Sequence, residues 1–183
     1  MTENRWIASR MDPLHRTAPA VSAAPAQDEA SNVVPLFAEG ALPDPDDLRL
    51  SEDDRRELVS WTIACAERLL PLFQQERPDD DRPREALAAA EAFLRGELDI
   101  DAVREKAFAC HEAARQAQDP SAIAAARVCG QAVAVAHLAG HSRQVPRHTA
   151  RAFPGDRSRR DEELAWQRMN IPARFDAYVY EGD

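Results

Sequence analysis

The sequence has few aromatic residues and little glycine, and its β-branched residues are sparse. β-branched and aromatic side chains favour strands, so their scarcity disfavours a β-sheet. No apolar run reaches the length that a membrane-spanning helix needs. The N-terminal region also lacks the apolar core of a secretory signal. These absences predict a helical, soluble protein that resides in the cytoplasm.

Motifs that would mark an active site are also missing. Cys65, Cys110 and Cys129 stand apart, without C-x-x-C spacing, which indicates buried, reduced thiols. The chain has no glycine-rich phosphate loop, no His-Glu-x-x-His pattern and no Ser-His-Asp arrangement. The sequence therefore names no catalytic residue and implies no cofactor, although an enzyme of unrecognised type stays open.

Charge is abundant but uneven. The formal net charge of −9 argues against sequence-independent binding to nucleic acid and suits a basic partner. Residues 1–47 carry 8 acids and 3 arginines, whereas residues 142–160 carry 6 arginines and 1 acid. The basic segment is interpreted either as a linker or as a site for phosphate or an acidic protein face. Its arginines are Arg143, Arg147, Arg151, Arg157, Arg159 and Arg160.

Residues 1–47 read as a tail in front of a domain at residues 48–180. Six prolines lie there among alanine, serine and acidic residues. Such a composition buries too little apolar surface to offset the entropy of ordering, so we expect disorder. The apolar island Val33-Val34-Pro35-Leu36-Phe37 is interpreted as a patch that attaches the tail to the domain, or as a short linear motif.

Three helices are predicted before the most apolar stretch. Ser51 begins the first with a capping-box pattern, and Pro71 predicts a kink or an early end. Pro83 can open the second helix and Gly96 can close it. Asp99 is placed to cap the third.

The most apolar stretch, residues 121–141, predicts a central helix. Asp119 and Pro120 supply its cap and first residue, and Pro146 stops or kinks it. One face would carry Ile123, Ala126, Gly130, Val133, His137 and Gly140. A last short helix is expected at residues 161–169. The joints are short, which favours an all-α antiparallel bundle of about five helices.

Histidines form the first candidate site. His137 and His141 are four residues apart, which places both on one helical face if the central helix continues. His111, on the preceding helix, could approach them. A structural role with hydrogen bonds in the core is one interpretation. A ligand pocket and a metal site are the others.

The acidic run Asp79-Asp80-Asp81, followed by Arg82, is the second candidate. Three acids could chelate a hard cation. More often such a run is a solvated loop whose last members cap the next helix, with Arg82 or Arg84 pairing back.

These motifs occur together in an order that resembles a known family. The residues that carry the likeness are Leu50-Ser51-Glu52-Asp53-Asp54, Trp61, Cys65-Ala66, Leu70-Pro71-Leu72-Phe73, Pro78-Asp79-Asp80-Asp81-Arg82-Pro83-Arg84, Gly96-Glu97, Ala109-Cys110-His111, Ala124-Ala125-Ala126-Arg127, Gly130-Gln131-Ala132-Val133-Ala134, Ala136-His137-Leu138-Ala139-Gly140-His141 and Glu163-Leu164-Ala165-Trp166-Gln167-Arg168. With them the chain resembles the immunity-5-like proteins linked to bacterial polymorphic toxin systems. The chain departs from the family pattern at two places. Gln131 stands where the family has histidine, and Val145-Pro146-Arg147 stand where the family continues with an alanine-rich helix.

The resemblance implies a non-enzymatic binding protein that neutralises a cognate bacterial toxin by covering its active surface. An acidic protein of this kind would be steered toward a basic, nuclease-type toxin. The alternative is a helical protein that binds a small ligand or a metal through His111, His137 and His141. Neither membrane nor nucleic acid is expected as a partner. The motif residues proposed for interaction or structure are Asp79, Asp80, Asp81, Arg82, Arg127, His111, His137, His141 and Trp166.

Overall fold

The computed structural model describes residues 49–181, and every regular element in that range is helical. The α-helices are α1 (Glu52–Glu76), α2 (Arg82–Leu94), α3 (Ile100–Gln116), α4 (Pro120–Ala134), α5 (Gln144–Thr149), α6 (Arg157–Asn170) and α7 (Asp176–Tyr180). Two 3-10 helices, η3 (Ala139–Arg143) and η4 (Ala173–Phe175), lie among the last of them. The predicted all-α bundle is confirmed, and the short helices α5 and α7 are added to the five predicted.

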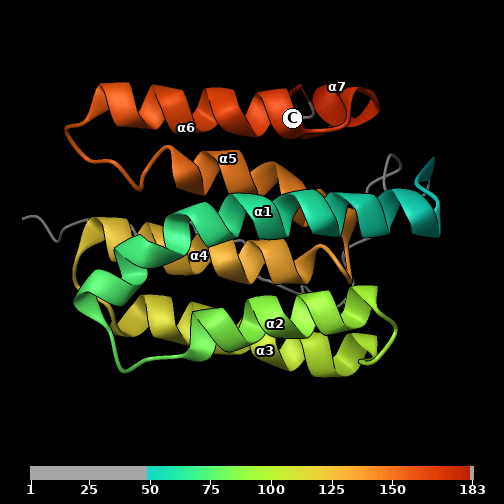
Figure 1. The fold of residues 1–183 in the computed structure, drawn as a ribbon, viewed down its shortest axis with the longest axis horizontal. Helices are drawn as coiled ribbons and strands as arrows, with labels where there is room; N and C mark the ends of the chain where they lie inside the picture. The colour runs from blue at the N-terminus through green and yellow to red at the C-terminus, as the bar shows by residue number, and fades with distance from the viewer. Residues whose placement is uncertain (1–48, 182–183) are drawn as a thin grey trace, which may run out of the picture. The chain divides into compact units, whose positions relative to one another are not determined.

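The first helix begins where the sequence predicts. The Ser51 side chain accepts a hydrogen bond from the Asp54 N–H, and the Asp54 carboxylate accepts one from the Ser51 N–H, which completes a capping box. Pro71 does not end the helix, which continues to Glu76. Figure 1 shows the last turns of α1 bending toward the start of α2, as expected where proline removes one backbone donor.

The second and third helices also follow their predicted signals. Pro83 lies in the first turn of α2, and Gly96 follows its end with a φ of 76°. That left-handed backbone is where glycine is favoured, and it lets the Glu97 N–H donate to the Ala92 carbonyl at 2.9 Å. Asp99 caps α3 by accepting from the Ala102 N–H at 2.9 Å.

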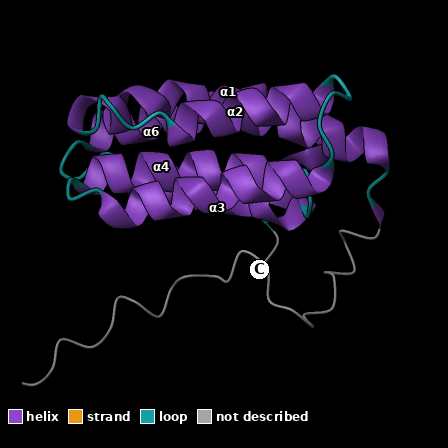
Figure 2. Ribbon diagram, turned by 90° about the horizontal axis from the view of Figure 1, so that it is seen from below, coloured by secondary structure: helices purple, strands orange, loops and turns teal. Residues whose placement is uncertain are grey.

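The helix α4 is central, but it is shorter than predicted. It packs against α1, α2, α3 and α5, and Figures 1 and 2 show it between neighbours rather than at the edge. It ends at Ala134 instead of continuing to residue 141. Tight turns follow, and Leu138 is extended, with a φ of −142° and a ψ of 114°. Here the N–H groups of Ala136 and His137 donate to carbonyls three residues back, instead of four as in an α-helix, so the backbone is more tightly wound.

Two boundaries near the C-terminus differ from prediction. Pro146 lies in the first turn of α5, where its missing N–H costs little, so it stops no helix. The helix α6 begins at Arg157 rather than at residue 161, because Asp156 accepts from the Arg159 N–H at 3.0 Å and so caps the helix earlier. Gly155, which has a φ of 82°, lies in the turn before α6.

The helices form layers. Figure 1 shows α6 and α7 in one layer, then α5, then α1 with α4, and finally α2 with α3. Trp61 joins α1 to α6, because its Nε1 donates to the Gln167 carbonyl at 3.1 Å. The core between the layers is rich in alanine, which lets α1, α3 and α4 approach closely.

The predicted tail at residues 1–47, with its apolar island at residues 33–37, lies outside the described residues. Cys65, Cys110 and Cys129 are buried and free, as predicted. Among residues 49–181, none of the helices combines the length and the apolar character that crossing a bilayer requires.

Candidate functional site

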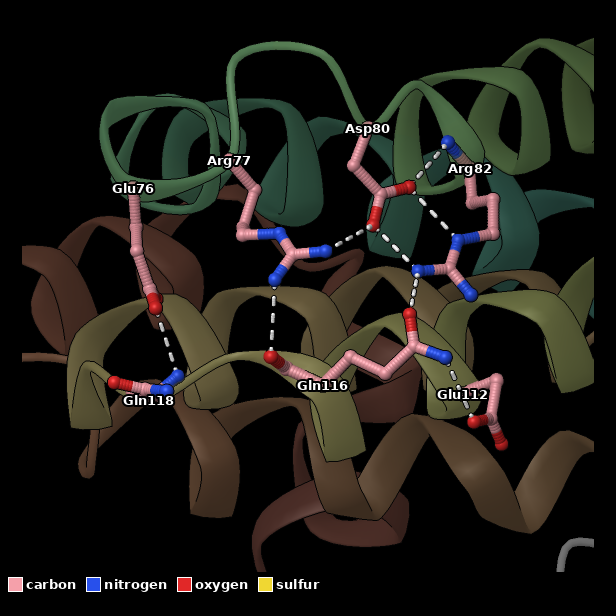
Figure 3. Close-up of polar contacts among 7 residues, drawn as sticks. All are labelled: Glu76, Arg77, Asp80, Arg82, Glu112, Gln116 and Gln118. Carbon is pink, nitrogen blue, oxygen red and sulfur yellow. Dashed lines mark hydrogen bonds and ion pairs between the residues drawn. The ribbon is translucent and has the colours of Figure 1, made fainter.

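The acidic run lies in the loop between α1 and α2, where Asp80 is held by arginines (Figure 3). Its carboxylate accepts from Arg82 Nε at 2.8 Å and from Arg82 Nη2 at 2.5 Å. Arg77 Nη2 lies 4.0 Å from the second carboxylate oxygen. The hydrogen bonds from Arg82 hold the pKa of Asp80 below its ordinary value, so the side chain stays ionised at neutral pH.

The same arginines reach the end of α3. Arg82 Nη2 donates to Gln116 Oε1 at 2.7 Å, and Arg77 Nη1 donates to the Gln116 carbonyl at 3.1 Å. Gln116 Nε2 in turn donates to Glu112 Oε1 at 3.0 Å. The loop after α1 is therefore bonded to α3, as Figure 3 shows.

Glu76 extends this network to the start of α4. Its carboxylate accepts from the backbone N–H groups of Gln118 at 2.8 Å and Asp119 at 3.1 Å. Asp119 then accepts from the N–H groups of Ser121 and Ala122, which caps α4. We call the following six residues, which lie in the α1–α2 loop and at the helix ends beside it, the Asp80 network: Glu76, Arg77, Asp80, Arg82, Glu112 and Gln116.

The sequence prediction for this loop was right about pairing and wrong about capping. Arg82 pairs with Asp80, and Arg84 pairs with Asp81 at 2.5 Å. Asp81 precedes α2 but makes no side-chain cap bond. Its backbone is helical, with a φ of −84° and a ψ of −4°, instead of the extended conformation typical of a capping residue. Asp79 is exposed.

An open cleft of about 680 Å³ lies over this loop. Five acidic and two basic residues line it, so its formal charge is negative. The acids are Glu76, Asp79, Asp80, Asp81 and Glu85. Because the two arginines are already engaged by Asp80, the cleft presents a fixed acidic surface to a partner.

The histidines that the sequence grouped do not lie on one helical face. α4 ends before His137, which lies in the following turn and is partly buried, while His141 lies in η3 and is buried. Burial lowers the pKa of His137, and Arg104 and Arg55 lower it further. A place in the core, which was one interpretation of these histidines, therefore fits His141 better than the partly buried His137.

His141 and His111 occupy a different place. His141 Nδ1 lies 2.8 Å from Gln131 Oε1, so the residue that departs from the family pattern holds this ring. His111 packs against Gly130: a Cβ built there would lie 2.8 Å from His111 Nε2 and 3.2 Å from the Cβ of Cys110. Gly130 is thus a close-packing position, as its place in mid-helix suggests.

The charge of Arg127 acts on both His111 and His148, although the sequence did not single out His148. Burial lowers the pKa of His111 to about 4, and Arg127 and His141 add to that effect. Burial lowers the pKa of His148 to about 3, with further contributions from Arg127, Arg151 and His111. The buried residues Val145, His148, Thr149 and Ala152 recur at helical spacing, a signal that the linker interpretation overlooked.

These histidines do not form a metal centre. Among residues 49–181, no three or more His, Cys, Asp or Glu side chains are arranged to hold a metal ion. His137 faces Arg104, Arg55 and Asp101, a different set of charges from those around His111. The structure does not bring His111, His137 and His141 together as the alternative function requires.

Trp166 has a structural setting. The guanidinium of Arg68 lies over its ring at 4.0 Å and donates to both carboxylate oxygens of Glu163, at 2.7 and 2.9 Å. This contact joins α1 to α6 beside the Trp61 bond. Trp166 therefore helps to attach α6 to the bundle.

Comparison with known proteins agrees with the motifs. A family model described as Imm-5 like putative immunity protein matches residues 48–174, which is more than half of the chain. Neither a curated protein nor a solved structure matches the chain significantly. The matched segment contains α1 to α6, the Asp80 network and the histidines. The chain therefore belongs to the Imm-5 like putative immunity protein family.

Proposed function

We propose that this protein neutralises a cognate bacterial toxin by binding it, without catalysing a reaction. The observation that carries the proposal is the family match over residues 48–174. Immunity by binding needs a surface whose shape is fixed before the partner arrives, because ordering a loop on binding costs free energy. The bonded loops of the Asp80 network provide such a surface.

The acidic cleft is the proposed contact surface. Asp79 lines the cleft and is exposed, and Glu85 of α2 also lines it, with its carboxylate 2.9 Å from Lys106 Nζ. A basic toxin surface would be steered toward this charge and held in register by it. The net charge of −9 acts in the same direction.

The electrostatics of the cleft favour binding over catalysis. A general acid or base works best with a pKa near the working pH. The pKa of Asp80 is instead lowered by the bonds from Arg82, so its carboxylate keeps its charge at neutral pH. A permanently charged, paired carboxylate suits an ionic contact.

The test has two steps. The tagged full chain is used to capture partners from its native host, and the captured protein is identified by mass spectrometry. That protein is then expressed in a test bacterium with and without this chain. Growth arrest by the partner alone, relieved by co-expression, is the expected result. A captured partner that is not toxic, or toxicity that co-expression does not relieve, would refute the function.

The cleft is tested with charge reversals. Asp79→Lys should weaken toxin binding about tenfold or more, because it opposes a basic partner at a site with no folding role. Glu162→Lys makes the same charge change on the exposed side of α6, where Glu162 accepts only from Ser158 Oγ, and should leave binding unchanged. Relief of toxicity that is equally strong for both variants would place the toxin contact elsewhere.

A further inference from the structure

Arg127, near the middle of α4, meets no acidic side chain among the residues that the structure describes. It is partly buried, and within residues 49–181 it makes no ion pair or hydrogen bond. Burial lowers its pKa, and Arg151 and Arg115 lower it further. A desolvated charge of this kind is costly unless something of opposite sign meets it.

His148, at the end of α5, supplies a second unmet group. Its side chain is 6% exposed, and its Nδ1 is buried without a hydrogen-bond partner among the described residues. Buried polar atoms are nearly always paired, so an orphaned ring nitrogen points to a missing partner. The Arg151 N–H donates to the His148 carbonyl at 3.0 Å, which fixes Arg151 in the turn directly after this histidine.

The groups that act on these side chains are all basic. The neighbours that shift the pKa values of Arg127, His111 and His148 are arginines and histidines, with no carboxylate among them. One of these, Arg115, is compensated by Glu112, to which its Nε donates at 2.9 Å. Arg127 and Arg151 have no such acid within the described range.

We propose that Arg127, His148 and Arg151 form a binding site for a phosphate-type oxyanion, either inorganic phosphate or a phosphate monoester. The three groups come from α4, α5 and the turn after α5, and Figure 1 shows α4 and α5 as neighbours. Two guanidiniums balance the charge of a phosphate dianion and present forked donors to its oxygens. The neutral His148 ring donates through Nδ1–H in the tautomer that the anion selects.

The number of donors favours phosphate over carboxylate. A carboxylate has two oxygens and one charge, whereas a phosphate monoester has three terminal oxygens and close to two charges. The guanidiniums of Arg127 and Arg151 and the imidazole of His148 match the three oxygens and two charges of the phosphate group better than those of a carboxylate. The ligand must be small or terminal, because His148 is almost fully buried and only Arg151 of the three is exposed.

Titration calorimetry on the full chain tests this site with three probes: inorganic phosphate, ribose 5-phosphate and malonate. We expect saturable binding of a phosphate probe and weaker binding of malonate. Tighter binding of ribose 5-phosphate would assign an ester as the source, and tighter or equal binding of inorganic phosphate would assign the free ion. Binding of malonate that equals or exceeds both would overturn the phosphate assignment.

Three variants locate the binding. Arg127→Gln and Arg151→Gln should each weaken phosphate binding about tenfold or more, because each removes a charge-assisted contact. Arg95→Gln, which removes the same charge at an exposed ion pair with Glu97, should leave it unchanged. No saturable binding by the wild type, or equal weakening in all three variants, would overturn the site.

Thermal unfolding separates a ligand-binding arginine from a structural one. In phosphate-free buffer, Arg127→Gln should not lower the Tm, because it removes an uncompensated, partly buried charge. Added phosphate should raise the Tm of the wild type and of Arg95→Gln, but not that of Arg127→Gln. A marked fall in Tm for Arg127→Gln without phosphate would show that Arg127 serves the fold instead.

Discussion

In the Asp80 network the charged groups meet opposite charges or backbone donors, whereas the groups that act on Arg127, in the middle of α4, are cations. Asp80 lies between Arg82 and Arg77, and Glu76 satisfies two backbone donors. Arg127, by contrast, is surrounded by arginines and histidines. Both regions belong to one compact unit and both involve α4, so burial alone does not explain the difference.

The difference separates groups that serve the fold from groups that await a partner. A paired network contributes to stability and fixes the loops that it joins. An unpaired cluster of like charges lowers stability and is retained where function requires it.

The largest expected effect is acid destabilisation through the histidines. The pKa of His111 is lowered to about 4 and that of His148 to about 3, from an ordinary value of 6.5. The unfolded chain therefore takes up protons first as pH falls. The stabilising contribution is complete above pH 6.5 and is lost between pH 6.5 and the folded pKa values, at up to roughly 1.4 kcal/mol per pH unit for each histidine.

Urea denaturation at several pH values in phosphate-free buffer measures this loss. His148→Gln should flatten the profile between pH 6.5 and 4, because glutamine does not titrate. The Asp80 network should keep its contribution to stability over the same pH range. The pKa of Asp80 is lowered below 3.8, so this contribution is lost only as pH falls through that lower value. A wild-type free energy of unfolding that is constant from pH 7 to 5 would contradict the histidine assignment.

Gly130→Leu should be nearly as damaging. A Cβ at this position already lies 2.8 Å from His111 Nε2, so the larger side chain must displace the ring or separate α3 from α4. Overpacking of this kind costs about 1–3 kcal/mol in the free energy of unfolding. Leucine at the exposed position Ala88 of α2 provides a control with a neutral outcome. If both variants unfold at the same urea concentration, α3 does not press on Gly130.

Asp80→Asn should destabilise the protein by about 1–2 kcal/mol, because it leaves Arg82 without its bidentate acceptor and weakens the link to Gln116. Asp79→Asn, at the exposed neighbour, should change stability by less than about 0.5 kcal/mol. The two variants are compared by their urea midpoints at pH 7. Equal midpoints would mean that the Asp80 network adds no stability.

The smallest effect is expected for His137→Gln. His137 is only partly buried and belongs to neither charged region, so the cost should stay below about 1 kcal/mol. Thermal unfolding at pH 7 and 5.5 provides the measurement. A loss of more than about 1 kcal/mol at either pH would contradict this minor role of His137.

The sequence alone determined the start of most helices. Ser51, Asp99 and Asp119 cap their helices as predicted, because capping depends on residues within one turn of each other. The acidic loop and the pairing of Arg82 with Asp80 were predictable for the same reason, because the residues involved are close in the sequence.

Only the tertiary structure decided which side chains meet. Gln116 and Gln118 are more than thirty residues from their partners Arg82 and Glu76, so no local pattern predicts those bonds. The end of α4 at Ala134 was also invisible, since the apolar spacing continues past it. That turn separates His137 from His111, and packing of α5 on α4 brings in His148 instead. Periodicity fixes the face of a residue within one helix, but the contacts between helices depend on how the whole core packs.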